Sequence, residues 1–147
     1  MDKRKMMFRQ EKNESGATKI YIYDDITAQG PFNWETWEYD ESETSAKYFI
    51  SLLNSIPDGS DIELHINSCG GEVKEGVAIY NLLKAKQANK VCHIDCFAYS
   101  VAYVVALGCD KIIMHRGSTI LLHNMWCTCS GNADQLRKAA DDLDELM

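Results

Sequence analysis

The residues best suited to chemistry are a serine, a pair of adjacent glycines and four histidines. Ser100 stands in the most apolar stretch of the chain, and seven apolar or aromatic residues follow it before Gly108. This pattern predicts a buried helix that begins after Ser100 and ends at Gly108. A serine at a helix start is either a cap or a nucleophile. The preference of serine for caps favours the cap, and the GxSxG elbow of many hydrolases is absent.

The glycine pair Gly70–Gly71 lies where a predicted strand (61–67) gives way to a predicted helix that begins near Val73. Glycines at such a junction bring backbone N–H groups close to a bound group, although they are also typical of a tight turn. The GxGxxG and GK[ST] patterns of nucleotide sites are absent. Ligands of open α/β sheets bind at the carboxyl ends of strands, where N–H groups and a helix start can hold an oxyanion.

The chain near Ser100 contains no base, so the histidines are the candidates. His65 and His93 fall within predicted strands, with His65 expected to be exposed, and His115 ends a strand. His123 ends the strand 118–123 and enters an irregular segment, which favours it as a site residue. Two groupings could be metal ligands: Cys92, His93 and Cys96, or His123, Cys127 and Cys129. Because neither has a CxxC-type spacing, we predict no metal and no cofactor, and six reduced cysteines.

Composition limits the function classes. A chain of 147 residues with 46% hydrophobic and 25% charged residues is expected to form one domain. Its net charge of −7 argues against binding to nucleic acid or to an anionic membrane. No apolar run reaches the length of a membrane span, and the charged start lacks the apolar core of a signal peptide, so a cytoplasmic location is predicted.

The positions of strands and helices predict an α/β fold with a largely parallel sheet. Residues 1–17 are expected to be a flexible arm, and residues 18–147 the domain. Strands are predicted at 19–23, 61–67, 90–96, 110–115 and 118–123. Helices are predicted at 40–56, with Asp40 and Glu43 as a capping box, from 73 onward with Val73, Val77, Tyr80 and Leu83 at helical spacing, and at 132–147. In the aperiodic segment 24–39, core or loop packing of Trp34 and Trp37 is favoured over an exposed contact patch.

Taken together, three segments resemble the Clp peptidase proteolytic subunit (ClpP) family. INSCGGEV at 66–73, followed by GVAIY at 76–80, is similar to the family's INSPGG…GxAIY run. AYSVA at 98–102 is similar to its nucleophile segment, and DKIIM at 110–114 with LLHN at 121–124 to the segment that carries its histidine. The similarity covers residues 19–147, and Asn124 and Trp126 after the histidine are most similar to the phage and prophage branch.

This resemblance implies a fold, a reaction and a set of partners. The fold would be the ClpP/crotonase-like spiral of ββα units. Ser100 would be the nucleophile, His123 the general base, and the N–H groups of Gly71 and Val101 the oxyanion hole, with substrate binding as a strand along Gly70 and Gly71. The chain would be an ATP-dependent serine endopeptidase subunit that hydrolyses unfolded or phage-related proteins. It would assemble with its own copies into heptameric rings and be served by an AAA+ unfoldase.

Several positions depart from the family pattern. Cys69 replaces a proline, and Cys96 and Tyr99 replace small residues near the nucleophile. No residue matches the third triad member, an Asp, which in the family follows a long helix of which only the first part is matched before Met147. The chain is therefore expected to be a C-terminally truncated, weak or inactive peptidase. The alternatives are a non-catalytic Clp-like subunit for structure or assembly, and a crotonase-type acyl-CoA enzyme, which the Ser100–His123 spacing disfavours.

Overall fold

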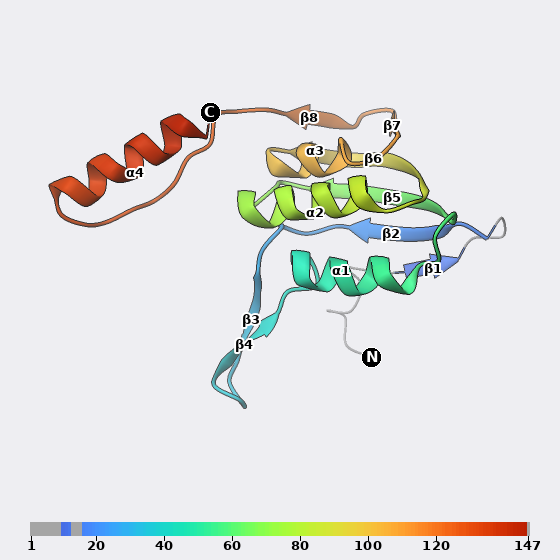
Figure 1. Cartoon of the computed structure of the whole chain (residues 1–147), viewed down its shortest axis with the longest axis horizontal. Helices are drawn as coiled ribbons and strands as arrows, with labels where there is room; N and C mark the ends of the chain where they lie inside the picture. The colour runs from blue at the N-terminus through green and yellow to red at the C-terminus, as the bar shows by residue number, and fades with distance from the viewer. Residues whose placement is uncertain (1–9, 13–15, 147) are drawn as a thin grey trace.

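A six-stranded sheet forms the centre of the computed structural model, which describes residues 10–12 and 16–146 (Figure 1). The strand order is β1-β2-β5-β6-β7, and β8 also pairs with β6. All of these pairings are parallel except that of β1 with β2, so the predicted α/β fold with a largely parallel sheet is confirmed. The sheet strands are β1 (Gln10–Lys12), β2 (Thr18–Ile22), β5 (Asp61–Ser68), β6 (Asn89–Tyr99), β7 (Lys111–Met114) and β8 (Thr119–Leu121).

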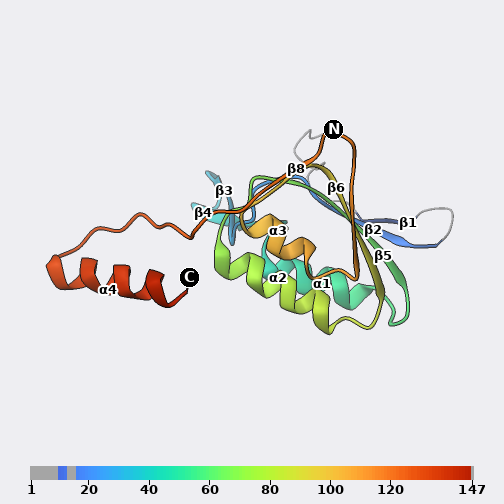
Figure 2. The same cartoon turned by 90° about the horizontal axis from the view of Figure 1, so that it is seen from above.

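Three helices cover one face of this sheet, and no helix of the described residues covers the opposite face (Figure 2). They are α1 (Ala46–Ser55), α2 (Val73–Ala85) and α3 (Val101–Ala106). The alternation of β5 explains the two faces. Ile62, Leu64 and Ile66 are buried in the core, whereas Glu63 and His65 point to the other side and are half-buried. The core therefore lies between the sheet and the helices.

The β6 strand is the longest of the sheet and has two parallel neighbours along one edge. β7 pairs with its first half, at Val91–Ile94, and β8 pairs with its end, at Phe97–Tyr99. The two strands predicted on either side of Arg116–Gly117 are thus both present. This arrangement brings the end of β8 to the point where β6 enters α3.

Core or loop packing was predicted for Trp34 and Trp37, and the prediction is wrong for the core. Both lie on the hairpin of β3 (Gln29–Asn33) and β4 (Glu38–Glu41), and each is 74% exposed. Their rings pack edge-to-face against one another and against Phe32. The two tryptophan rings therefore contact other aromatic rings of the hairpin and not the buried core.

The first helix begins later than predicted. Ser45, not Asp40, is the cap of α1, because its side-chain oxygen accepts a hydrogen bond from the Tyr48 N–H at 3.0 Å. Asp40 lies in β4, where its carboxylate accepts a hydrogen bond from the Asn33 side chain at 3.2 Å. Pairing with β3 therefore outweighed the capping-box pattern.

The helix predicted from Val73 onward is present as α2, and of the four apolar residues at helical spacing only Leu83 is buried. Gly76, Ile79 and Leu83 are buried, whereas Val73 and Val77 are 37% and 40% exposed. The cause is a close approach between α2 and α3: a Cβ at Gly76 would lie 2.2 Å from a methyl carbon of Val101. The helix turns its glycine, and not its valines, toward its neighbour.

The last helix, α4 (Ala133–Glu145), begins as predicted, with Asn132 and Gln135 forming a capping box. It extends away from the sheet at the end of an irregular segment (Figures 1 and 2), and none of its described residues is buried. Most of the predicted arm 1–17 lies outside the described residues, but Gln10–Lys12 form β1. None of the described helices has both the length and the apolar character to cross a membrane.

Candidate functional site

Ser100 occupies a strained turn between β6 and α3. Its backbone angles are φ 53° and ψ −130°, a region that costs a residue with a Cβ about 1–3 kcal/mol. Ser100 holds the N-cap position of α3, yet its side chain makes no capping hydrogen bond to that helix. The cap interpretation therefore lacks the bond that would justify it. A strained strand-to-helix turn is also the backbone arrangement that exposes the nucleophile in many serine hydrolases.

Gly70 lies directly against Ser100, although the two are far apart in the sequence. A Cβ at Gly70 would lie 2.7 Å from the Tyr99 carbonyl oxygen, 2.8 Å from the Ser100 Cβ and 3.4 Å from the Ser100 Oγ. Gly70 has a φ of 100°, which L side chains rarely adopt. Only glycine combines this conformation with this contact. The fold thus brings together the glycine pair and the serine that sequence analysis selected separately.

The loop is held in place by the segment before β3. The Ile26 N–H donates to the Gly70 carbonyl oxygen at 2.7 Å, and the Ile26 carbonyl oxygen accepts from the Glu72 N–H at 2.8 Å. A Cβ at Gly71 would lie 2.1 Å from that carbonyl oxygen, so glycine is required here too. Within the described chain, the Gly71 N–H has no acceptor, and Val101 begins α3, where N–H groups have no intrahelical partner. Neither predicted oxyanion donor therefore has a hydrogen-bond acceptor among the residues that the structure describes.

The side chain of Glu72, the residue after the glycine pair, also holds the loop against the segment before β3. Its carboxylate accepts a hydrogen bond from the Ala28 N–H at 3.0 Å and pairs with Lys74 at 3.0 Å. The backbone hydrogen bond, and then Lys74, lower the pKa of Glu72. Both contacts favour the ionised form of the carboxylate.

His123 is placed by β8. Tyr99 pairs with Leu121, and the Ser100 N–H donates to the Leu121 carbonyl oxygen at 2.7 Å. His123 follows two residues later and is exposed. Its Nδ1 donates to the Asn124 carbonyl oxygen at 2.7 Å, since a carbonyl can only accept. Nε2 of the neutral ring therefore carries the lone pair that a general base needs.

The serine and the histidine are not hydrogen-bonded to each other in the described chain. No carboxylate there lies within ion-pair distance of His123, and its ring partner is the Asn124 carbonyl oxygen. One contiguous group is thus formed by Ser100, Gly70, Gly71 and Val101. His123 follows β8, whose last residue, Leu121, is hydrogen-bonded to Ser100. Two hollows of the described structure lie elsewhere, against the β3–β4 hairpin.

Sequence analysis missed a cluster of histidines on the helix-free face. His65 was expected to be exposed, but its side chain is only 14% exposed, because its ring stacks between those of Tyr21 and His93. The ring of His93 stacks in turn on that of His115. Burial, and then the neighbouring His65 and His115, lower the pKa of His93. The polar alternation of both strands was visible in the sequence, but the register that places His65 opposite His93 was not.

Neither of the two cysteine-containing groupings considered in the sequence forms a set of close donor atoms in the described part of the chain. The set that does form consists of Glu63, His65 and His93. All six cysteines are free thiols, as predicted. Cys92 is buried against Cys109, and the hydrogen bond between the two thiols, together with burial, raises the pKa of Cys92.

Comparisons with known proteins identify the family to which the chain belongs. Residues 34–147 match the Clp protease family. Among solved structures, a mutant of ClpP1 from Listeria monocytogenes is similar in fold, with a TM-score of 0.58 and 17% identity over 86% of this chain. The aligned region spans 64% of that protein. No curated protein matches the chain. Because the family match includes α1 to α4 and every glycine, serine and histidine of the candidate site, the chain belongs to the Clp protease family.

Proposed function

We propose that this chain is a serine peptidase subunit in which Ser100 is the nucleophile and His123 the general base. The observation that carries the proposal is the conformation of Ser100. If Ser100 had only a structural role, its positive φ would be a cost without a benefit. Its missing capping bond and its contact with Gly70 would also be unexplained. All three are consistent with a hydroxyl held in place for reaction beside an oxyanion loop.

The proposed reaction is acyl transfer. Nε2 of His123 takes the hydroxyl proton as the Ser100 oxygen bonds to the peptide carbonyl carbon, whose oxygen becomes an oxyanion bound by the N–H groups of Gly71 and Val101. His123 then returns the proton to the amide nitrogen, and the C–N bond breaks to release the amine product. Water, deprotonated by His123, attacks the acyl-Ser100 ester. The second product leaves as an acid, and Ser100 regains its proton.

The substrate we propose is an unfolded polypeptide bound as an extended strand along Gly70 and Gly71. The position of Gly70 directly against Ser100 supports this choice. Substrates related to a phage, delivery by an AAA+ unfoldase at the cost of ATP, and a cytoplasmic location follow as proposals from family membership. Assembly into rings is supported by α4, whose apolar residues have no described neighbour that buries them.

A second candidate is a non-catalytic Clp-like subunit. One observation favours it: the described residues contain no carboxylate in contact with His123, whose ring is oriented only by the Asn124 carbonyl oxygen. Loss of the orienting carboxylate reduces the rate of a serine triad by about 10⁴-fold in a well-studied case. We therefore propose that a catalytic form of this chain is slow.

Steady-state hydrolysis of a set of fluorogenic peptides separates the two candidates. The peptidase proposal requires a low but saturable kcat/KM that falls to background in Ser100→Ala and in His123→Ala. Cys69→Ser is the matched control, because Cys69 is the exposed loop neighbour that has no proposed role. Hydrolysis that survives in Ser100→Ala would refute the proposal, and folded protein without hydrolysis would favour the non-catalytic subunit.

A further inference from the structure

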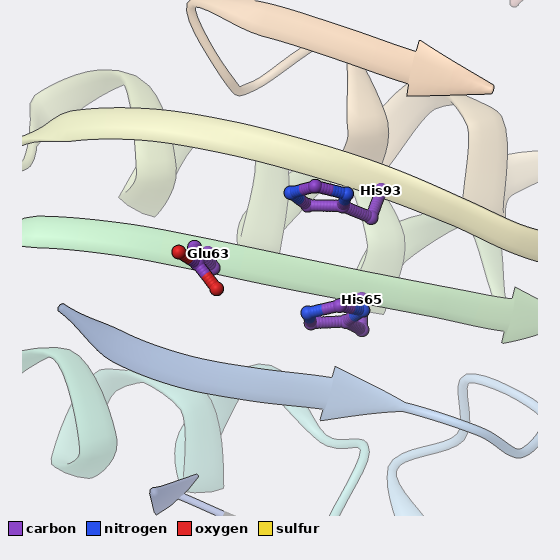
Figure 3. A group of neighbouring side chains, drawn as sticks. All are labelled: Glu63, His65 and His93. Carbon is purple, nitrogen blue, oxygen red and sulfur yellow. The ribbon is translucent and has the colours of Figure 1, made fainter. Parts of the chain in front are cut away.

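A second group of chemically competent side chains lies on the sheet face opposite the helices. Figure 3 shows Glu63 and His65 on β5 beside His93 on the neighbouring β6. One donor atom from each residue lies within 4.8 Å of the other two, and all three residues are half-buried. The group is remote from the turn at Ser100 and has no part in the reaction proposed above.

The orientation of His65 points to a ligand. Its Nδ1 lies 2.9 Å from an oxygen of Asp95, so Nδ1 carries the proton and Nε2 carries the lone pair. Nε2 is buried, and among the described residues it has no hydrogen-bond partner. Leaving a buried acceptor unpaired is unfavourable. Histidines that bind metal ions have this arrangement: one ring nitrogen donates a hydrogen bond to a carboxylate, and the other offers its lone pair to the metal.

Several charged and polar groups surround the three residues and would interact with a bound cation. Asp95 also accepts from the Tyr23 hydroxyl and lies 3.3 Å from His115 Nε2, which in turn lies 3.3 Å from His93 Nδ1. Glu63 pairs with Lys19 at 3.4 Å. A metal ion bound by Glu63 would replace the ammonium group of Lys19 with a divalent charge. Two carboxylates in the cluster would compensate that charge.

We propose that Glu63, His65 and His93 bind a divalent transition metal ion of the Zn²⁺ type, with Asp95 positioning His65. Two imidazoles and one carboxylate suit Zn²⁺, whereas Mg²⁺ and Ca²⁺ prefer oxygen ligands alone. Tetrahedral coordination at about 2.0–2.2 Å brings ligand atoms to about 3.4 Å from one another. The rings of His65 and His93, now stacked at an interplanar angle of 12°, must tilt toward a common point to reach this geometry.

Titration of the full chain with Zn²⁺ against a chromophoric chelator tests the site, and Co²⁺ serves as the spectroscopic probe. We expect one Zn²⁺ per chain, a rise in the melting temperature, and a visible Co²⁺ spectrum of a tetrahedral site without sulfur-to-metal charge transfer. Asp95→Asn should weaken Zn²⁺ binding about 10–100-fold. Glu63→Gln and His93→Gln remove a ligand and should weaken it more.

The cysteines and His123 provide the controls. A double substitution of Cys127→Ser and Cys129→Ser, and separately His123→Gln, should leave the Zn²⁺ affinity unchanged. Circular dichroism establishes that each variant is folded. Zn²⁺ binding that is unchanged in folded Glu63→Gln and His93→Gln, a Co²⁺ spectrum with thiolate bands, or no stoichiometric Zn²⁺ binding to the full chain would each overturn the proposal.

Discussion

The backbone N–H of Ser100 donates to the carbonyl oxygen of Leu121 at 2.7 Å, so the end of β8 is fixed at the turn that carries the proposed nucleophile. In an extended chain the two residues from Leu121 to His123 cover about 7 Å. The position of the proposed base therefore depends on β8 and not on a direct bond to Ser100. The glycine loop reaches the same turn from β5, held by Ile26.

The strain at Ser100 predicts a difference between two substitutions that both remove the hydroxyl. Ser100→Gly relieves the positive φ, whereas Ser100→Ala retains it. We expect Ser100→Gly to have a free energy of unfolding about 1 kcal/mol greater than that of Ser100→Ala. Urea unfolding of both variants measures this difference. Equal stabilities would show that the turn carries no strain.

The close contact of Gly71 with Ile26 predicts a large effect of a single methyl group. In Gly71→Ala the Cβ would lie 2.1 Å from the Ile26 carbonyl oxygen, and the loop must move. We expect a loss of about 2–3 kcal/mol in unfolding free energy and of hydrolysis by the remaining folded protein.

Gly117→Ala is the matched control for that substitution. Gly117 also has a positive φ, of 88°, but a Cβ there would have no neighbour within 4 Å. Only the conformational cost applies, so we expect a loss of about 1 kcal/mol, measured by urea unfolding, and unchanged hydrolysis. Equal losses in the two variants would contradict the packing of the glycine loop on Ile26.

Much of the sheet could be predicted because its strands are marked by local alternation. Ile62, Leu64 and Ile66 alternate with polar residues, and the structure has β5 there. The start of α1 could not be predicted in the same way. Asp40 and Ser45 both resemble caps, and only the pairing of β4 with β3 decides between them. Trp34 was misplaced because its partners in the hairpin are other exposed aromatic rings.

The candidate site was predicted from motifs, and its geometry was not. The segments around Gly71, Ser100 and His123 were identified by resemblance, but the φ of Ser100 and its contact with Gly70 depend on tertiary structure. The cluster around His65 was missed because it depends on the register between β5 and β6. The sequence around a histidine on the polar face of a strand does not indicate which residue lies opposite it on the neighbouring strand.

Asp110 predicts a pH dependence of stability. Its carboxylate accepts a hydrogen bond from the Lys90 N–H at 2.8 Å and lies 3.3 Å from the ammonium of Lys90, whose side chain is 6% exposed. The backbone hydrogen bond, and then the Lys90 side chain, lower the pKa of Asp110. A lowered folded-state pKa contributes stability that is present above the unfolded pKa of about 3.9 and is lost as the pH falls through the folded pKa.

Urea unfolding of the unmodified chain and of Asp110→Asn at pH 7 and pH 3 tests this contribution. We expect the variant to be less stable by about 1 kcal/mol or less at pH 7, because the carboxylate is 57% exposed and screened by solvent. The difference should shrink at pH 3. A difference that grows as the pH falls would contradict the assigned sign.

The exposed apolar face of α4 predicts self-association. Leu136 is 43% exposed, and the helix has no described buried residue. Burial of a whole leucine side chain is worth about 1.5–3 kcal/mol, and Leu136 has 43% of its surface left to bury, so Leu136→Gln should weaken association about threefold to tenfold. Arg137→Gln, on the adjacent polar face, is the control. Sedimentation velocity of the full chain measures the assembly, and a monomer at all concentrations would contradict the prediction.

The most direct test of the central claim is covalent labelling of the folded full chain with a fluorophosphonate, followed by peptide mapping with mass spectrometry. The hydroxyl oxygen of an activated serine displaces fluoride from phosphorus and leaves a stable adduct. The proposed role of Ser100 predicts an adduct on Ser100, no adduct at that position in Ser100→Ala, and slower labelling in His123→Ala. Folded protein that carries no adduct on Ser100, or labelling that His123→Ala does not slow, would contradict it.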